Sequence, residues 1–397
     1  MGVTVVACPV CEGVALAPFF RSREWSSSLV YLADDTSYAP RDPLPIMLEY
    51  CRTCGFVRQA PGFEVTLDYT GRERDTAKQL PDYASRIIAS LAESAVAPDD
   101  LVVEVGANDG TFLRALRATG HRHLMGVEPS TWLAAKGLES GLAVVNDYFG
   151  RRVAADLVRL HGQARAVFCR HTLEHVPDIR DLTQGIADLL APGGLGFIEV
   201  PDTDWIISDL FAHEIWDEHI SYFRAGSLAR LLRSCGLTPL RIERVRFRDT
   251  RNLLCWAQRD TAESVAPAAL LGDATSKQEM AGFQERWDAF AARLRAVVGR
   301  APRPLIAVGA SHIQVNFLNY AGLDGSVDLM IDDDPTKAGH YAPLARAVPI
   351  RSTADVLQSV RAGTVLRTAF PYPAWEDRIC DALAPHGIAA IKPYDHR

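Results

Sequence analysis

The chain has 397 residues, of which 48% are hydrophobic and 23% charged, the balance of an ordinary soluble protein. One hydrophobic core rarely serves more than about 250–300 residues, so we expect two or three domains. The 42 Lys and Arg against 49 Asp and Glu give a net charge of −7 without a basic cluster, which argues against a nucleic-acid partner, and no apolar run approaches the roughly 20 residues of a membrane span.

The chain opens with MGVTVVACPV, which lacks a basic start followed by a long apolar core. We therefore expect no signal peptide and a cytoplasmic protein without a membrane partner.

Four of the eight cysteines form two pairs, each with two residues between the partners: Cys8 and Cys11 in CPVCEG, and Cys51 and Cys54 in CRTCGF. This spacing lets both sulfurs of a tight turn face one ion, and Gly13 and Gly55 follow where such turns need relaxed backbone. Four thiolates predict a tetrahedral zinc site that stabilises a small domain and has no open position for chemistry. The alternative is two incidental pairs of buried cysteines.

From residue 101 short apolar runs alternate with amphipathic stretches. The expected strands are LVVEVG, HLMGVEPS, LAVVN, ARAVFC and LGFIEVP, and the expected helices lie in TFLRALRATG, TWLAAKGLES, ADLVRL and DLTQGIADLL. Such alternation predicts an α/β domain with a doubly wound parallel sheet, whose ligand lies at the carboxyl ends of the strands.

The stretch EVGANDGTF follows the first of these strands and opens the first helix. Gly106 and Gly110 allow a ligand to approach the backbone, and Glu128 ends the next strand, where a carboxylate can accept both hydroxyls of a ribose. The combination predicts an adenosine-containing ligand. For Asp109 the alternative is a helix N-cap, and both roles are compatible.

The stretch WDEHISYF places Glu218 and His219 side by side among Trp216, Tyr222 and Phe223. Histidine has a pKa near neutrality without tuning, so His219 is a candidate general base, Glu218 a group that orients a ring or holds a substrate hydroxyl, and the aromatic residues a wall that excludes water. The alternative is an ordinary helix entry with acidic residues at its amino end.

After a flexible link around RDTAESVAP, the stretch SKQEMAGFQERWDAFAARLRAVVG predicts a helix. PLIAVGASHIQVNFLNYAG reads as strand, glycine turn and helix, and VDLMIDDDPTKAG as a strand ending in acids. This second half-Rossmann unit lacks a full glycine fingerprint, so we expect it to cover the substrate or serve a structural role. The acids Asp332 to Asp334 precede Pro335 and are interpreted as a solvated turn.

In this order, the four cysteines, VVEVGANDGTFL, GVEPS, HTLEHVPD and WDEHISYF resemble the S-adenosylmethionine-dependent C-methyltransferases that modify nucleotide-linked deoxysugars. That family has an N-terminal zinc domain, a methyltransferase domain and a further α/β domain. The resemblance implies that Gly106, Asn108, Asp109 and Gly110 line the methionine end of the cofactor, Glu128 its ribose, and Asp147 with Tyr148 its adenine.

The same resemblance implies catalytic residues. His219 matches the family's general base, His175 in HTLEHVPD a functional histidine, and Tyr69 in LDYTG a tyrosine near the substrate. His171 and His213 are interpreted as surface or core residues.

The chain also departs from the family pattern where substrate contacts are expected, with GASHIQ, APLARAVPI, DTRNLL and the tryptophan of WDEH in place of the family's residues. The changes remove donors for a sugar or its diphosphate. Replacement phosphate contacts from Arg248, Arg251, His312 or Lys337 are a further hypothesis.

We therefore predict three domains: zinc-binding at 1–70, methyltransferase at 71–260 and a covering α/β domain at 261–397. The expected reaction methylates a carbon α to a carbonyl, on a nucleotide-linked keto-deoxysugar or a related small molecule in a natural-product pathway, with S-adenosylmethionine as donor. The alternatives are methyl transfer to oxygen or nitrogen of another small molecule, and a non-catalytic adaptor. The sequence leaves the oligomeric state open and is compatible with a monomer.

Overall fold

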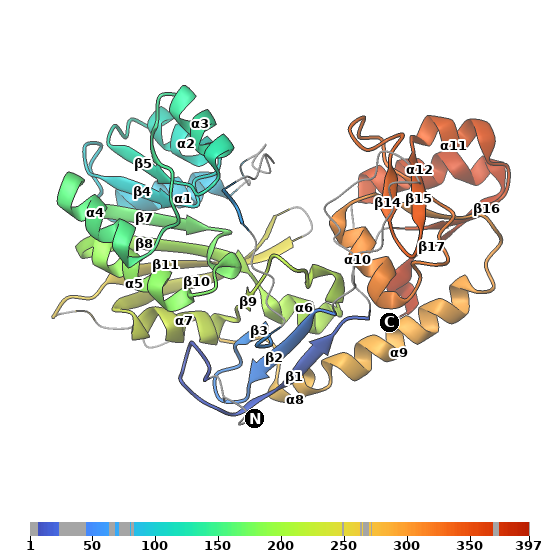
Figure 1. Cartoon of the computed structure of the whole chain (residues 1–397), viewed down its shortest axis with the longest axis horizontal. Helices are drawn as coiled ribbons and strands as arrows, with labels where there is room; N and C mark the ends of the chain where they lie inside the picture. The colour runs from blue at the N-terminus through green and yellow to red at the C-terminus, as the bar shows by residue number, and fades with distance from the viewer. Residues whose placement is uncertain are drawn as a thin grey trace.

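The computed structural model describes residues 7–23, 45–62, 68–70, 80, 83–247, 250–262, 264, 270, 272–367 and 373–396. These residues form three β-sheets with helices around them (Figure 1). The insert between the two cysteine pairs lies outside the described residues from 24 to 44, as do Arg248 and residues 263 and 265–267 of the expected flexible link.

The first sheet is antiparallel and is completed by a strand from the middle of the chain. Its order is β1 (Leu16–Arg21), β2 (Met47–Cys51), β3 (Val57–Gln59) and β9 (Ser221–Tyr222). In the last pairing Val57 lies opposite Tyr222. The Gln59 side-chain amide donates to the carbonyl oxygens of Asp217 and His219 at 2.9 and 3.1 Å. This sheet therefore holds the WDEH stretch from one side.

The central sheet has seven strands in the order β10-β11-β8-β7-β4-β5-β6. The strands are β4 (Val102–Val105), β5 (Leu124–Val127), β6 (Ala143–Val145), β7 (Ala164–Arg170), β8 (Leu190–Pro201), β10 (Leu237–Phe247) and β11 (Thr250–Arg259). All neighbours are parallel except that β11 runs antiparallel to both β8 and β10. The strand order reverses between β4 and β7, the point where such sheets bind ligands.

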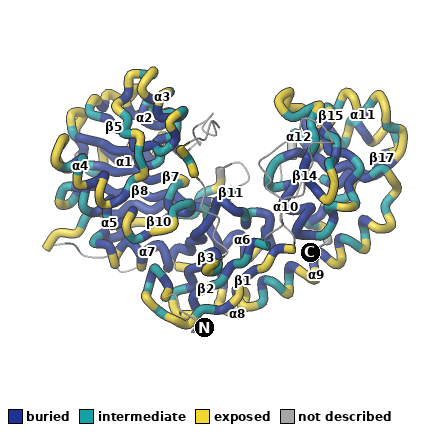
Figure 2. Tube along the Cα trace, viewed as in Figure 1, coloured by how far each residue is buried: buried dark blue, intermediate teal, exposed yellow. Residues whose placement is uncertain are grey.

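Helices flank this sheet: α1 (Ala84–Glu93), α2 (Thr111–Ala118), α3 (Thr131–Glu139), α4 (Arg151–His161), α5 (Ile179–Leu189) and α7 (Ala225–Ser234). Strands β4 and β5 are buried at every residue because helices cover both faces (Figure 2). Two helix starts follow from local sequence, since the side chains of Ser130 and Asp178 accept from the free amides of α3 and α5.

The segment between β8 and α7 leaves the central sheet and returns to the same place. It contains α6 (Thr203–Asp209), a short 3-10 helix (Ala212–Glu214), the WDEH stretch and β9. Asp202 at its start pairs with Phe223 at its end in an isolated bridge. The excursion thus brings the WDEH stretch to the carboxyl ends of the central strands.

The C-terminal sheet has the order β14-β15-β13-β12-β16-β17 and is parallel except for β14. Its elements are β12 (Leu305–Val308), α10 (His312–Ala321), β13 (Leu329–Ile331), β14 (Tyr341–Pro343), β15 (Ala347–Arg351), α11 (Thr353–Ser359), β16 (Gly363–Leu366), α12 (Pro373–Leu383) and β17 (Ile388–Ile391), with 3-10 turns at Ala384–His386 and Pro393–His396. It is reached through α8 (Lys277–Ala281) and α9 (Phe283–Val298).

Helix α9 joins this part to the first sheet (Figure 1). Phe19 of β1 stacks on Phe283 with ring centroids 4.8 Å apart, and Phe290 stacks on Tyr394 at 5.2 Å. One continuous apolar core therefore includes the first sheet, α9 and the C-terminal sheet. The α/β architecture and the second half-Rossmann unit are as predicted from the sequence. The division at residues 70 and 260 stays a prediction.

One alternative is wrong, and one local expectation is confirmed only in part. WDEHISYF does not enter a helix, because Asp217 and Glu218 form a turn and β9 follows. Asp333 and Asp334 are exposed as predicted, but Asp332 is 7% exposed, since its carboxylate accepts from the amide of Ala310 and from Lys337, both at 2.9 Å. Across the described ranges, no helix has both the length and the apolar character that crossing a membrane requires.

Candidate active site

The glycine turn after β4 lies at the point where the strand order reverses. Gly106 and Gly110 have φ of +70° and +80°, and Asn108 between them has φ of +51°. A Cβ at Gly106 would lie 2.1 Å from Oγ1 of Thr172, which follows β7. The turn therefore needs glycine both for its backbone conformation and for its contact with the neighbouring strand end.

Glu128 fixes this turn from the end of β5. It is 6% exposed, and its two carboxylate oxygens accept from the backbone amides of Asn108 at 2.8 Å and Ser130 at 2.9 Å. The carboxylate joins the glycine turn to the start of α3. Each oxygen has further lone pairs, so these bonds are compatible with the predicted ribose contact.

Asp109 lies one residue before Gly110, the N-cap of α2, so the alternative interpretation of Asp109 as the N-cap is wrong. Its carboxylate accepts from the Thr111 amide at 2.9 Å and pairs with Arg114 at 2.9 Å. Burial opposes ionisation, but these bonds outweigh it and hold the pKa of Asp109 below its ordinary value.

The predicted adenine region lies just beyond β6. Asp147 pairs with Arg152 at 2.7 Å, and this bond lowers its pKa. The Tyr148 ring is 46% exposed, and its hydroxyl accepts from the backbone amide of Tyr69 at 2.8 Å. The backbone of Thr70 also accepts from the Thr131 amide at 3.1 Å. Residues 68–70 thus lie against the ends of β5 and β6.

Tyr69 extends from there toward the predicted catalytic residues. Its hydroxyl lies 3.2 Å from Nδ1 of His175, and the same Nδ1 lies 2.9 Å from the main-chain carbonyl oxygen of Glu218. A carbonyl only accepts, so Nδ1 carries the proton in this arrangement and donates to Glu218. The structure therefore brings Tyr69, His175 and Glu218 together, with the backbone of Glu218 orienting the His175 ring.

His219 completes this group. Its ring centroid lies 4.8 Å from that of His175 and 4.9 Å from that of Trp216. The ring is 8% exposed, and burial together with the neighbouring His175, His171 and His312 places its pKa well below the ordinary value. The imidazole is consequently neutral near pH 7, the form that accepts a proton.

The loop that carries His219 is held by Tyr222, whose hydroxyl accepts from the Trp216 amide and donates to the Trp216 carbonyl, both at 3.2 Å. Phe223 is buried against Phe56, with ring centroids 5.3 Å apart. The aromatic wall therefore consists of Trp216 and Tyr222, while Phe223 belongs to the core.

His171, interpreted from the sequence as a surface or core residue, contacts two buried carboxylates near the candidate site. It directly follows β7 with φ of +46°, and its two ring nitrogens lie 3.4 Å from Glu174 and 3.2 Å from Glu199. Burial alone would lower its pKa, but the two carboxylates outweigh burial and raise it to about 10. His213 is buried in the core, with Nδ1 3.1 Å from the hydroxyl of Tyr394.

The four residues proposed as replacement phosphate contacts, Arg248, Arg251, His312 and Lys337, do not form one cluster in the sequence. His312 at the start of α10 stacks on Trp216, with ring centroids 4.6 Å apart and planes 26° apart. Arg251 lies 3.7 Å from Asp209, and Lys337 pairs with Asp332 at 2.9 Å. Arg248 lies outside the described residues.

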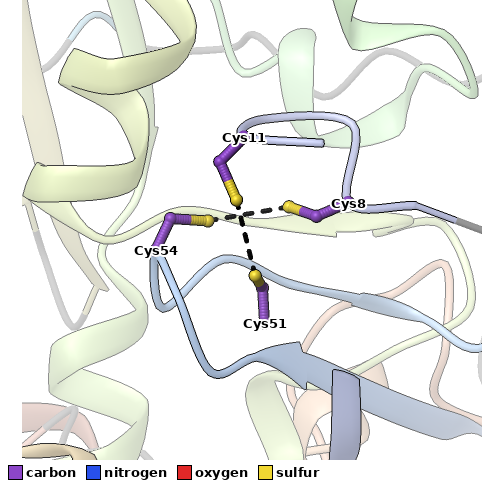
Figure 3. A group of neighbouring side chains, drawn as sticks. All are labelled: Cys8, Cys11, Cys51 and Cys54. Carbon is purple, nitrogen blue, oxygen red and sulfur yellow. Dashed lines mark hydrogen bonds between the residues drawn. The ribbon is translucent and has the colours of Figure 1, made fainter. Parts of the chain in front are cut away.

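The four N-terminal cysteines form one cluster, with their sulfurs directed toward a common centre (Figure 3). The sulfurs of Cys8 and Cys54, and those of Cys11 and Cys51, lie 3.6 Å apart. Tetrahedral metal–sulfur bonds of about 2.3 Å place the sulfurs about 3.8 Å apart, so the geometry fits a metal ion.

The glycines beside these cysteines have different roles. Gly55 has φ of +73°, as its turn was expected to require. Gly13 does not, because the relaxed residue of the first turn is Glu12 with φ of +61°. Gly13 is instead tightly packed, since a Cβ there would lie 3.1 Å from Oγ1 of Thr53.

Two residues of the site were not singled out from the sequence, although both lie in the quoted HTLEHVPD. Thr172 contacts the glycine turn, and Glu174 is buried beside His175 and His219. The available signal was their position just after β7, at the predicted ligand edge of the sheet.

Comparison with known proteins agrees with this geometry. Residues 72–242 match the family model described as a methyltransferase domain. This part of the chain, less than half of its length, is therefore similar to methyltransferase domains.

Among curated proteins, the C-methyltransferase NovU of Streptomyces niveus is 31% identical over 221 residues, 55% of this chain and 52% of that protein. A ubiquinone biosynthesis O-methyltransferase of Erwinia tasmaniensis is 34% identical over 96 residues, 23% of this chain and 39% of that protein. The chain thus spans about half of the first relative's length and less of the second. A magnesium protoporphyrin IX methyltransferase from Synechocystis PCC 6803 matches with a TM-score of 0.34 and 15% identity, over 45% of this chain and 78% of that one.

Proposed function

We propose that this chain is an S-adenosylmethionine-dependent C-methyltransferase in which His219 is the general base. The observation that carries the proposal is a buried imidazole, its pKa well below the ordinary value, on an excursion that starts and ends at the carboxyl end of the central sheet. Gly106 contacts Thr172, the short helix after Thr172 carries His175, and the His175 ring lies 4.8 Å from His219. A proton acceptor and the methyl donor would then share one end of the central sheet.

The reaction needs a carbon nucleophile. His219 takes a proton from the carbon next to a carbonyl group, leaving an enolate. The enolate carbon attacks the sulfonium methyl group, and the electron pair of the sulfur–methyl bond stays on sulfur, which gives S-adenosylhomocysteine. The donor is already activated, so alignment and exclusion of water by Trp216 and Tyr222 supply much of the rate.

The other predicted site residues have supporting roles in this proposal. Tyr69 and His175, whose side chains lie 3.2 Å apart, hold the acceptor's oxygen in this proposal, and Glu218 orients His175 through its main-chain carbonyl. For the cofactor, Gly106, Asn108, Asp109 and Gly110 line the methionine end, Glu128 binds the ribose, and Asp147 with Tyr148 borders the adenine.

The proposed acceptor is a nucleotide-linked keto-deoxysugar or a related small molecule of a natural-product pathway. NovU, with which the chain shares 31% identity over 221 residues, is named a C-methyltransferase, which supports carbon as the target. The Trp216–His312 stack lies where the sequence departs from the sugar-modifying pattern, so the acceptor's sugar contacts differ from those of that family.

The ion proposed for the four-cysteine cluster is zinc, because four thiolates at tetrahedral distances are its usual structural ligands. Cys8, Cys51 and the neighbouring Phe56 are buried in the same apolar core as Phe223. The ion would therefore stabilise the wall behind the WDEH loop without taking part in methyl transfer.

Methyl transfer to oxygen is the second candidate, favoured by the match to ubiquinone O-methyltransferases over 96 residues. Product analysis separates the two. The protein is incubated with nucleotide-linked keto sugars and other carbonyl compounds, using S-adenosylmethionine labelled with ¹³C in the methyl group. The proposal predicts a product with a methyl group bonded to carbon. A methyl group on oxygen or nitrogen would establish the second candidate. If calorimetry showed binding of neither S-adenosylmethionine nor S-adenosylhomocysteine, the protein would instead be a non-catalytic adaptor.

A further inference from the structure

Glu174 is a buried carboxylate to which the proposed methyl transfer assigns no role. It is 1% exposed and belongs to the short 3-10 helix Leu173–His175. Its Oε1 lies 3.4 Å from Nδ1 of His171, whereas its Oε2 has no hydrogen-bond partner among the residues that the structure describes. Burial of a carboxylate with one oxygen unpaired is costly, so a role that needs its charge is expected.

The carboxylate lies beside the proposed base. One oxygen of Glu174, one nitrogen of His219 and one nitrogen of His175 all lie within 4.8 Å of one another. The amide of Ile220 donates to the main-chain oxygen of Glu174 at 2.8 Å, so the residue after His219 is tied to the helix that carries Glu174. The backbone therefore holds the carboxylate close to His219.

The charge on His219 changes during the proposed reaction. Methylation of carbon releases one proton, so the neutral imidazole becomes an imidazolium although its ring is only 8% exposed. Burial and the neighbouring His175, His171 and His312 oppose this change and lower the pKa of His219. A negative charge within about 4–6 Å favours the charged form of a histidine, and Glu174 lies in this range.

We infer that Glu174 is a positioning residue for the general base and that its carboxylate stabilises the imidazolium formed when His219 takes the proton. A base held by a buried carboxylate is a recurring arrangement in enzymes. The inference rests on the proposed function, because it assigns Glu174 a role in that reaction. The proton passes from the acceptor carbon to His219 and then to solvent, while Glu174 stays ionised throughout.

His171 keeps this carboxylate from charging the base in advance. It lies 3.4 Å from Glu174 and 3.2 Å from Glu199. Burial opposes its charge, but the two carboxylates outweigh burial and raise the pKa of His171 to about 10. His171 is therefore a cation near pH 7 that balances Glu174 while His219 is neutral. Its charge lowers the pKa of His219, so His171 and Glu174 act on the base in opposite directions.

The first test needs no acceptor. ¹⁵N NMR of the histidine rings, from about pH 4 to 9, follows protonation of His219 in His171→Asn and in the double variant His171→Asn with Glu174→Gln. Loss of the His171 cation should raise the pKa of His219. Further loss of the Glu174 charge should then lower its proton affinity by about 10- to 1000-fold. The inference is overturned if the pKa of His219 is the same in both folded variants.

Two further variants serve this titration. His219→Asn identifies the signals of the His219 ring, because only those signals disappear. His161→Asn, at the end of α4, is the matched control and should leave the pKa of His219 as it is in the unchanged protein.

A second test separates proton removal from methyl transfer. The acceptor identified with the unchanged protein is incubated in D₂O with S-adenosylhomocysteine in place of the donor, and ¹H NMR follows exchange of the hydrogen next to the carbonyl. Glu174→Gln should slow this exchange by at least about 10-fold with unchanged affinity for S-adenosylhomocysteine. Glu174→Asp keeps the charge and should exchange faster than Glu174→Gln, which a purely structural role would not require.

Failure of the inference and failure of the proposed function give different results. If Glu174→Gln exchanges at the rate of the unchanged protein while His219→Asn does not exchange, Glu174 has no role and His219 is still the base. If His219→Asn also exchanges at the unchanged rate, the proposed base is wrong, and the role of Glu174 is overturned with it.

Discussion

The imidazole rings of His175 and His219 lie 4.8 Å apart with their planes at 72°, although 43 residues separate them in the chain. His175 follows β7 of the central sheet, and His219 lies on the excursion held by the N-terminal sheet. The edge-to-face contact therefore joins two sheets at the candidate site, so a disturbance of either sheet should reach the proposed chemistry.

The pH dependence of methyl transfer should reflect the lowered pKa of His219. The imidazole acts as a base only when neutral, so the rate rises with pH through its pKa and then stays level. Because burial and the neighbouring histidines lower that pKa, the level region should extend below the ordinary histidine value of about 6.5. Initial rates of kcat/KM at low substrate, from about pH 5 to 8, measure this. An acid limb centred above about 6.5 would contradict the assignment.

Cofactor binding should depend on Gly106. Gly106→Ala adds a Cβ that would lie 2.1 Å from Thr172 Oγ1 at a φ of +70°, so the turn must move. We expect calorimetry to show at least about a 10-fold loss of affinity for S-adenosylhomocysteine, a cost of about 1.4 kcal/mol, within the range for strained backbone.

The matched control is Gly120→Ala. Gly120 also has positive φ, +101°, but a Cβ there has no neighbour within 4 Å. Gly120→Ala has the same kind of backbone strain but no steric clash, so the affinity of this variant for S-adenosylhomocysteine should stay unchanged. Equal losses in both variants would show that the Gly106 turn does not contact the cofactor.

Removing metal from the cysteine cluster should destabilise the fold. Cys54→Ser replaces one thiolate, and we expect the protein to lose the zinc bound at the cluster and to melt at a lower temperature. Elemental analysis and calorimetric melting measure the two effects. Cys380→Ser lies outside the cluster and should retain the zinc. A Cys54→Ser protein with unchanged metal content would show that the cluster is not a metal site.

Arg224 should contribute strongly to stability. It is 2% exposed and lies 2.6 Å from Asp204 and 3.3 Å from Asp273, and it also donates to the backbone of Thr275. Arg224→Ala removes one of two ion pairs of the buried Asp204, whose other partner is Arg244 at 2.8 Å, so we expect the free energy of unfolding to fall by about 1–3 kcal/mol.

Arg86→Ala is the comparison for this prediction, because Arg86 pairs with Glu243 at 3.2 Å with its side chain 56% exposed. Its loss should change stability by no more than about 1 kcal/mol. Denaturant unfolding of both variants gives the difference. Similar small changes in the two would mean that the buried ion pair is not stabilising.

Much of the fold follows from local sequence. The alternation of apolar runs predicted the central sheet, and Gly106, Gly110 and Glu128 lie together because neighbouring parallel strands end at one edge. The carboxylate of Glu128 was assigned only to a ribose contact, whereas it also accepts from the backbone amide of Asn108. That second role depends on the positive φ of the turn, which sequence spacing does not specify.

Contacts between distant segments could not be predicted in the same way. The stack of Trp216 on His312 joins the excursion to the C-terminal part, and β9 was not predicted because its pairing partner Val57 lies far away in the chain. Glu174 was passed over because its burial depends on the folded surroundings.

The most direct test of the account is His219→Asn with ¹³C-methyl S-adenosylmethionine and an acceptor identified with the unchanged protein. We predict that the variant binds S-adenosylhomocysteine with unchanged affinity, while formation of the carbon-methylated product slows by about 10²–10⁴-fold, the usual contribution of a general base. A variant that binds the cofactor normally and methylates carbon at the rate of the unchanged protein would contradict the central claim.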